Sequence, residues 1–311
     1  MSFSAEEYDP ATSDTWLVCT QCGTQFPSDD RNSIRTCRLC DDPRGSVPAS
    51  GQAFTTMADL KAQGHRNVFE EYASDSRICY ITSQPEIGIG QRATLLQTRA
   101  GNILWDCITL LDDETMQHIR GRGGLRAIVI SHPHFYSAHV QWARAFRCPV
   151  FLAAADAEWT TMRSGHQVLA TDVETEILDT GAKMIRVGGH FPGSMVLLYD
   201  RHAFIADTIM MTPAGFGNWK SDAMGRPRQR PPGQNSFAFL WSFPNRIPLG
   251  PDEIARMWSI IRNYEFDAAH GSFAYCDMED LDAKARLLDS MQMQIRAMGH
   301  PAHPLLNAVT L

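Results

Sequence analysis

The chain has 311 residues, of which 44% are hydrophobic, and a formal net charge of -7 at pH 7. This length and composition support one large globular domain or two unequal ones, and they exclude a disordered or low-complexity chain. The acidic balance, without any long basic run, argues against nucleic acid or an anionic membrane as a partner. No stretch approaches the ~18 consecutive apolar residues of a membrane span, and residues 1–10 lack an apolar signal segment. We therefore expect a cytoplasmic protein.

Four of the eight cysteines form two C-x2-C pairs near the N-terminus, Cys19 with Cys22 and Cys37 with Cys40. Each pair can present two thiolates from one tight turn, and four thiolates satisfy tetrahedral Zn²⁺ without an open position. We therefore predict a structural zinc-ribbon module over residues 1–50, with iron, as in rubredoxin, or disulfides as the alternatives. The other four cysteines are scattered in apolar segments, where we expect buried thiols.

After a linker rich in proline and glycine at residues 43–53, apolar runs alternate with helical patterns. The predicted strands are 78–81, 94–97, 102–105, 127–130, 150–152, 176–178, 183–187, 195–199 and 203–205. The predicted helices are 113–120, 140–146, 251–264 and 281–298. Residues 211–236, rich in glycine, proline and arginine, predict a long loop that could cover a site. This order of elements indicates an α/β layered sandwich over residues 51–311.

Three histidines follow the predicted strand at 127–130, namely His132, His134 and His139. On an extended segment, His132 and His134 would point to the same side, and Pro133 between them would stiffen the backbone. His139 stands at the start of the next predicted helix. Imidazole nitrogens are common zinc ligands, so this spacing predicts a metal site on the loop that follows the strand.

Three later segments supply further candidate ligands. His190 lies in the loop Gly-Gly-His-Phe-Pro-Gly, Asp207 follows a predicted strand, and His270 stands directly before a glycine. Asp106 also follows a predicted strand, and we interpret it either as the cap of a turn or as support for a metal-binding histidine. A metal held by such ligands can activate water, and the pattern therefore predicts a hydrolytic metalloenzyme.

The order H-x-H, G-H-x-P-G, strand-end aspartate and His-Gly resembles the metallo-β-lactamase superfamily over roughly residues 70–275. The resemblance implies a four-layer αββα sandwich in which loops at one edge hold two metals, usually zinc. By position it assigns His132, His134 and His190 to the first metal, Asp207 to both metals, and His270 to the second. The expected cofactors are then one or two catalytic zinc ions and one structural zinc ion.

The chain departs from the family motif H-x-H-x-D-H, because the aspartate and the last histidine fall on Tyr136 and Ser137. Neither residue is a good zinc ligand. His139 could replace the missing ligand of the second metal, and either Tyr136 or Asp207 could act as the catalytic residue that orients the attacking water. The resemblance thus leaves the second metal site altered, weak or empty.

The combination of motifs is more specific than the fold. The four-cysteine module, GQR at 90–92, LWDC at 104–107, SHPHFY at 131–136 and GHFPG at 189–193 together resemble SaxA-type isothiocyanate hydrolases. The resemblance implies detoxification of plant-derived isothiocyanates to an amine and carbonyl sulfide by metal-activated water. A lactam, ester or thioester hydrolase, a redox protein with an iron site, and a non-catalytic binding protein stay open as alternatives. The expected partner is a small-molecule substrate, and a homodimer is compatible with the sequence.

Overall fold

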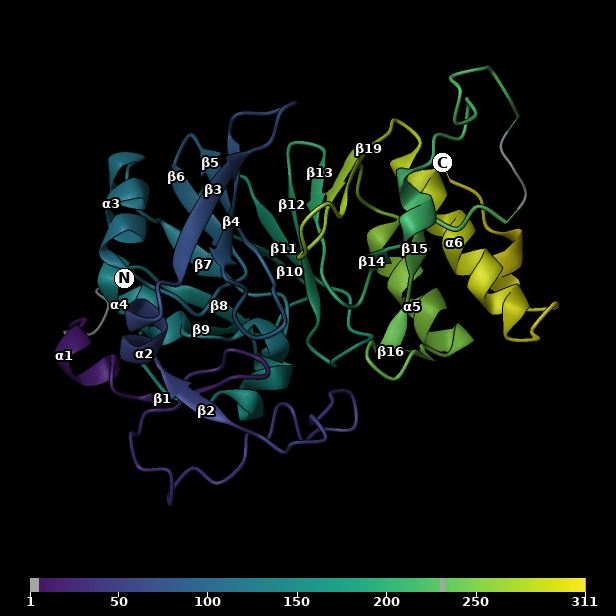
Figure 1. The fold of residues 1–311 in the computed structure, drawn as a ribbon. Helices are drawn as coiled ribbons and strands as arrows, with labels where there is room; N and C mark the ends of the chain where they lie inside the picture. The colour runs from purple at the N-terminus through teal and green to yellow at the C-terminus, as the bar shows by residue number, and fades with distance from the viewer. Residues whose placement is uncertain (1–5, 230–232, 311) are drawn as a thin grey trace. The chain divides into compact units, whose positions relative to one another are not determined.

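A computed structural model describes residues 6–229 and 233–310 of the chain (Figure 1). The chain forms two compact units, Met1–Met184 and Ile185–Leu311. The N-terminal module is hydrogen-bonded to the rest of the first unit, and its division from residues 51–311 as a separate domain stays a prediction. Thr109 Oγ1 donates to Gly23 O at 2.9 Å, and Thr161 Oγ1 donates to the backbone oxygen of residue 25 at 2.7 Å.

The first unit contains a seven-stranded mixed sheet in the order β3-β4-β5-β6-β7-β8-β9. Its strands are β3 (Arg66–Glu71), β4 (Ile78–Gln84), β5 (Ala93–Thr98), β6 (Gly101–Trp105), β7 (Ala127–Val129), β8 (Val150–Ala153) and β9 (Gln167–Ala170). Strands β3 to β6 pair antiparallel, and β6 to β9 pair parallel. Because β6 and β7 run parallel, the chain leaves both strands at the same edge of the sheet, and Asp106 and Ser131 follow them closely there.

Burial on both faces explains why the central strands read as continuous apolar runs. Val129 of β7 pairs with Trp105 on one side and with Phe151 on the other. All three side chains are buried. A parallel strand covered on both faces does not alternate between polar and apolar residues, and short apolar runs therefore marked these strands correctly in the sequence.

The helices of the first unit begin and end at capping signals. They are α1 (Pro10–Ser13), α2 (Met57–Ala62), α3 (Asp113–Gly121) and α4 (His139–Phe146), with the 3-10 turns η1 (Pro133–Phe135) and η2 (Ala154–Trp159). Helix α3 starts after Asp112, whose side chain accepts a hydrogen bond from Thr115 N at 2.7 Å. Helix α4 ends at Arg147 in the left-handed conformation. The remaining strands are β1 (Leu17–Cys19), β2 (Phe54–Thr56) and β10 (Glu174–Glu176).

A second sheet has the strand order β10-β11-β12-β13-β18-β19. Its further strands are β11 (Lys183–Arg186), β12 (Met195–Tyr199), β13 (His202–Phe204), β18 (Ala268–His270) and β19 (Asp277–Glu279). Strand β13 pairs antiparallel with β12 and parallel with β18, which pairs antiparallel with β19. The parallel pairing places Phe204 opposite His270.

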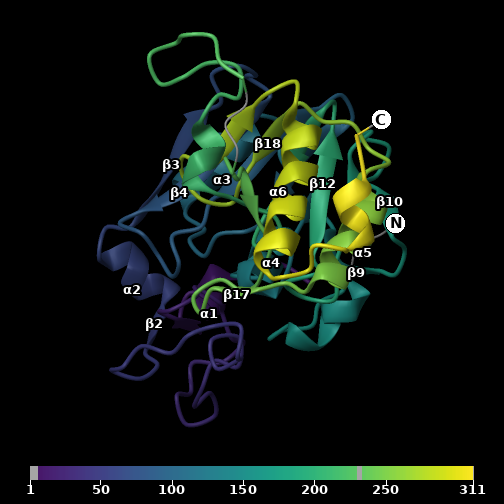
Figure 2. The ribbon, with the colours of Figure 1, turned by 90° about the vertical axis from the view of Figure 1, so that its right-hand side faces the viewer.

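The core of the second unit lies between its strands and two helices, α5 (Pro251–Ile261) and α6 (Ala283–Ala297) (Figure 2). Helix α5 buries Ile254, Met257 and Ile261, which are spaced three and four apart and so share one helical face. The smaller elements are β14 (Met210–Met211), η3 (Pro213–Phe216), β15 (Phe237–Ala238), β16 (Leu240–Ser242), β17 (Ile247–Pro248) and η4 (Pro304–Asn307).

Two predicted segments differ from the structure in detail. The strand expected at 176–178 ends at Glu176, because Leu178 and Asp179 form a turn with φ values of 46° and 60°. The loop expected at 211–236 lies between β14 and β15, and its residues 230–232 fall outside the described residues. Across the part of the chain that the structure describes, none of the helices combines the length and the apolar character needed to cross a membrane.

Candidate metal centre

Hydrogen bonds that involve Asp106 and Ser131 fix His132 at the end of strand β7. Asp106 is fully buried, and its Oδ1 accepts a hydrogen bond from Ser131 N at 2.7 Å. Ser131 Oγ in turn lies 2.8 Å from His132 Nδ1. An imidazole held at one ring nitrogen presents the other to a metal. Asp106 therefore supports the histidine loop, in agreement with the second interpretation of this residue.

His134 lies in a turn and not in the extended segment that the sequence predicted. His132 is extended, with φ of -169° and ψ of 172°, and Pro133 then begins η1, since the fixed φ of proline suits the first position of a helical turn. The two imidazole ring centroids are 5.2 Å apart. His132 is buried, whereas His134 is partly exposed. The turn thus brings the pair together, with His134 as its solvent-facing member.

His190 is held by the glycine-rich loop after β11. Gly188 and Gly189 have φ values of 69° and 92°, which favour glycine. A Cβ atom at Gly189 would lie 2.4 Å from Thr208 Oγ1. Thr208 Oγ1 donates to Gly188 O at 2.5 Å and accepts from His190 N at 3.3 Å. Thr208 therefore ties the histidine loop to the segment that follows β13.

Asp207 lies beside His190 within the second unit. Its Oδ2 atom is 3.7 Å from His190 Nε2, and both side chains are buried. A buried carboxylate is destabilising unless a positive or hydrogen-bonding group compensates it. Asp207 directly precedes Thr208, whose hydroxyl is bonded to the histidine loop. The two side chains form one half of a candidate metal centre.

His270 is fully buried on β18, beside His202 of β13. His202 Nδ1 lies 2.9 Å from His270 Nε2, and the two rings stack with centroids 5.1 Å apart. The other ring nitrogen of His270 lies 3.5 Å from Asp277 Oδ1. Both ring nitrogens face neighbouring side chains, and the binding of a second metal by His270 stays a prediction. The sequence carried no local sign of His202, because the parallel pairing of β13 with β18 brings it there.

His139 and Tyr136 are engaged inside the first unit. His139 Nδ1 lies 2.8 Å from Tyr136 O, and His139 Nε2 lies 2.8 Å from Gln167 Nε2. Burial lowers the pKa of His139 to about 4, so its ring is neutral at pH 7 and can donate from Nδ1 and accept at Nε2. The Tyr136 hydroxyl donates to Asp156 O at 3.3 Å, and burial raises the pKa of Tyr136. These polar atoms are bonded within the first unit, and the metal-binding role of His139 and the catalytic role of Tyr136 stay predictions.

The four cysteines of the N-terminal module form a buried cluster. The Sγ atoms of Cys19 and Cys40 are 3.8 Å apart, and those of Cys22 and Cys37 are 3.7 Å apart. Zn–S bonds of ~2.3 Å in a tetrahedron place two sulfurs about 3.8 Å apart, whereas a disulfide places them ~2.05 Å apart. All four cysteines are free thiols. The geometry therefore fits a thiolate-bound metal, zinc or iron, and excludes the disulfide alternative.

The candidate ligands of the histidine centre are three imidazoles and one carboxylate. They are His132, His134, His190 and Asp207. Each side chain offers one donor atom of a kind that binds zinc. Their role as ligands stays a prediction from the sequence, whereas the contacts of Ser131 and Thr208 with the histidine loops were not predicted.

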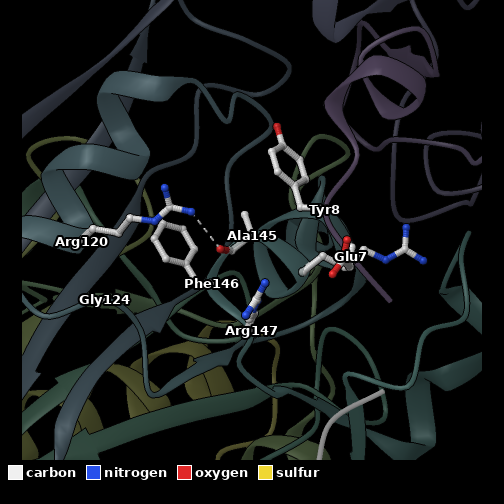
Figure 3. Close-up of a pocket in the computed structure, with 8 residues that line it drawn as sticks. Glu7, Tyr8, Arg120, Gly124, Ala145, Phe146 and Arg147 are labelled. Carbon is white, nitrogen blue, oxygen red and sulfur yellow. Dashed lines mark hydrogen bonds between the residues drawn. The ribbon is translucent and has the colours of Figure 1, made fainter. Parts of the chain in front are cut away.

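Three arginines line a separate cavity of about 450 Å³ in the first unit (Figure 3). Arg120 and Arg144 stand in the last turns of α3 and α4, where the carbonyl ends of a helix favour cations. Arg120 donates to Ala145 O at 3.3 Å, and Arg144 pairs with Glu6 at 2.7 Å. The hydrogen bond from Arg144 lowers the pKa of Glu6 to about 2. Helix ends and a carboxylate thus account for this charge, and the cavity is not a candidate anion site.

No family model matches the chain. The chain is 31% identical over 274 residues to "Uncharacterized protein YmaE" of Bacillus subtilis (strain 168), an alignment that covers 86% of this chain and 92% of YmaE. Among solved structures, the DIM-1 metallo-β-lactamase aligns with a TM-score of 0.50 and 13% identity, over 75% of this chain and 98% of that chain. FIM-1 from Pseudomonas aeruginosa, in its mono-zinc form, aligns with a TM-score of 0.46 and 14% identity, over 74% and 96% of the two chains. The likeness to DIM-1 confirms the predicted metallo-β-lactamase fold.

Proposed function

The chain belongs to the family of Bacillus subtilis YmaE, and we propose that it is a metal-dependent hydrolase. A fold alone does not determine an activity, so the side chains must carry the proposal. The observation that carries it is the buried His190–Asp207 pair, held by Thr208, in a chain of the metallo-β-lactamase fold. A buried carboxylate beside an imidazole is well suited to bind a metal ion, because the ion compensates the buried charge.

We propose that His132, His134, His190 and Asp207 bind one metal ion together. Three imidazoles and a carboxylate are ligands that suit Zn²⁺. When bound, a divalent metal would lower the pKa of water from ~15.7 to about 7 and polarise an electrophile. His134 is the partly exposed member of the set, and its Nε2 atom is buried.

The chain's own groups would then prepare this centre for hydrolysis. Ser131 fixes the ring of His132 through the contact at Nδ1, and Thr208 fixes the backbone of His190. We assign to Asp207 the task of accepting a hydrogen bond from the attacking water and receiving its proton. This role replaces the aspartate that the family motif has at the position of Tyr136.

For the substrate we propose an isothiocyanate. The reaction balances as R–N=C=S plus one water giving R–NH₂ and carbonyl sulfide, with attack on the central carbon and release of the nitrogen as the amine. The support is the joint occurrence of the four-cysteine module with the motifs at 104–107, 131–136 and 189–193, a combination that resembles isothiocyanate hydrolases. The partner in this proposal is a small molecule.

Amine release from phenethyl isothiocyanate by the purified full-length chain tests this proposal. We expect activity that a chelator abolishes and that added zinc restores. Activity confined to lactams, esters or thioesters in a parallel panel would replace the isothiocyanate and retain the hydrolase. A coloured, iron-containing protein that shows redox activity and hydrolyses nothing would overturn the proposal.

A further inference from the structure

Ser137 stands where the family motif has a histidine ligand of the second metal, and the structure uses it differently. The residue is buried, with φ of 44°. Its Oγ donates to Cys107 O at 3.1 Å and accepts from Gln91 Nε2 at 3.0 Å. Its backbone oxygen accepts a hydrogen bond from Gln25 N at 3.2 Å. A non-glycine residue keeps a left-handed conformation only when its surroundings fix it. Through these three hydrogen bonds, Ser137 connects the segments that contain Gln25, Gln91 and Cys107.

Gln25 connects Ser137 to the turn that carries Cys19 and Cys22, which we call the cysteine knuckle. It follows Cys22 by three residues, is buried, and forms a β-bridge with Val18. Cys19 N donates to Thr24 O at 2.9 Å, so the knuckle closes directly before Gln25. A metal that binds Cys19 and Cys22 would fix the segment whose backbone holds Ser137.

The knuckle is packed so closely that it cannot shift without moving its neighbours. A Cβ atom at Gly88 would lie 2.7 Å from the carbonyl carbon of Cys22. Thr109 Oγ1 donates to Gly23 O at 2.9 Å, and a Cβ atom at Gly23 would lie 2.1 Å from that hydroxyl. Such close contacts transmit displacement because a packed interior has little free volume.

We infer that the cysteine-bound metal positions the His132–His134 loop in place of a second catalytic metal. This inference rests on the proposed function. The loop between β7 and α4 is fixed at its start by Asp106, which binds Ser131 N, and close to its end by Ser137, which binds the cysteine knuckle. His132 and His134 lie between these two anchors.

The side chains at the other positions that could hold a second metal contact neighbouring polar groups. Tyr136 donates to a backbone carbonyl, His139 is bonded at both ring nitrogens, and His270 lies between His202 and Asp277. The chain therefore holds one metal at its histidines and one at its cysteines.

Metal content of the full-length chain tests the number of sites. After reconstitution with Co²⁺, we expect two metals per chain, one showing thiolate charge-transfer absorption and one showing only the weaker bands of nitrogen and oxygen ligands. A third, histidine-held metal would overturn the inference and leave the proposed function intact. Metal at the cysteines alone would instead overturn the proposed function.

A matched pair of glycine substitutions tests the positioning. Gly88→Ala would press on Cys22, whereas Gly124→Ala changes the same residue type at a similar φ, 76° against 63°, and meets no atom within 4 Å. The readout is chelator competition for the histidine-held metal, which does not depend on activity. We expect Gly88→Ala to weaken this affinity about 10-fold or more, the scale of losses at residues that support metal ligands, and Gly124→Ala to change it less than ~2-fold.

Thr109→Val provides the same test where Gly88→Ala does not fold, since it removes only the hydrogen bond to Gly23 O. We expect the histidine centre of this variant to bind its metal with lower affinity too, and we expect the thiolate absorption to be shifted or reduced. Unchanged affinity of the histidine centre in every folded variant that disturbs the cysteine knuckle would overturn the inference.

Discussion

The cysteine cluster and the histidine centre differ in their exposure to solvent. All four cysteines are buried, whereas the histidine centre includes His134, which is partly exposed. The cysteines also come from one short segment, residues 19–40, whereas the candidate ligands of the histidine centre are drawn from residues 132–207. A closed thiolate site contributes to folding, and a site with an accessible ligand leaves room for exchange. Substitutions should therefore affect stability at the first centre and activity at the second.

The largest expected effect is loss of turnover in His132→Ala. Substitution of a residue that merely supports a metal ligand lowers metal affinity or activity by about 10–100-fold. Removal of the ligand itself should therefore bring turnover to the level of the chelated enzyme. His300→Ala is the matched control, because His300 is exposed and outside both centres. Isothiocyanate turnover, zinc content and circular dichroism are measured together. Full activity in a metal-depleted His132→Ala protein would remove this residue from the candidate ligands.

Substitutions in the cysteine cluster should lower the stability of the folded chain. Cys37→Ser removes one of four thiolates, and we expect the free energy of unfolding to fall by about 4 kcal/mol, because metal binding here contributes directly to folding. Cys79→Ser makes the same change at a buried thiol outside the cluster and should reduce stability by only about 1–2 kcal/mol. Urea unfolding measures both. A fully stable Cys37→Ser protein whose turnover at saturating zinc is specifically altered would reverse the roles of the two centres.

The ligand candidates could be named from the sequence because their signals are local. The apolar run of β7 precedes His132, and the glycines before His190 mark the loop that carries it. The conformation of His134 was mispredicted because Pro133 favours a turn there over an extended strand.

Long-range pairing produces contacts that no local sequence pattern indicates. The nitrogen of His139 is bonded by Gln167, which lies 28 positions away in the sequence, and no local pattern indicates such a partner. His202 meets His270 through the pairing of β13 with β18. Hydrogen bonds such as that from Thr109 likewise join the N-terminal module to distant segments of the sequence.

The pH dependence of stability provides a third test, because it reports whether His139 is a metal ligand. Burial lowers the pKa of His139 from 6.5 to about 4. Between these values the unfolded chain binds a proton that the folded chain does not, so this contribution is complete above pH 6.5 and declines as the pH falls towards 4. A shift of this size corresponds to about 3 kcal/mol.

Urea unfolding of the chain and of His139→Gln across this pH window isolates the contribution. We expect the stability of the variant not to show this decline between pH 6.5 and 4. In the parent chain, we expect the decline in stability to be the same with and without a chelator. A decline that appears only after metal is removed would show that the metal, and not burial, keeps His139 neutral.

The smallest expected effect concerns the backbone that supports His190. Gly189→Ala combines a φ of 92° with a Cβ atom 2.4 Å from Thr208 Oγ1, whereas Gly124→Ala has a φ of 76° and open space. Both variants carry the strain of a positive φ, and only the first adds a clash, which should reduce stability by about 1–3 kcal/mol more. Because Thr208 holds the backbone of His190, the histidine-held metal should also bind more weakly in Gly189→Ala. Thermal unfolding and chelator competition measure the two effects. Equal behaviour of the two variants would show that the fit of this loop against Thr208 does not position the ligands.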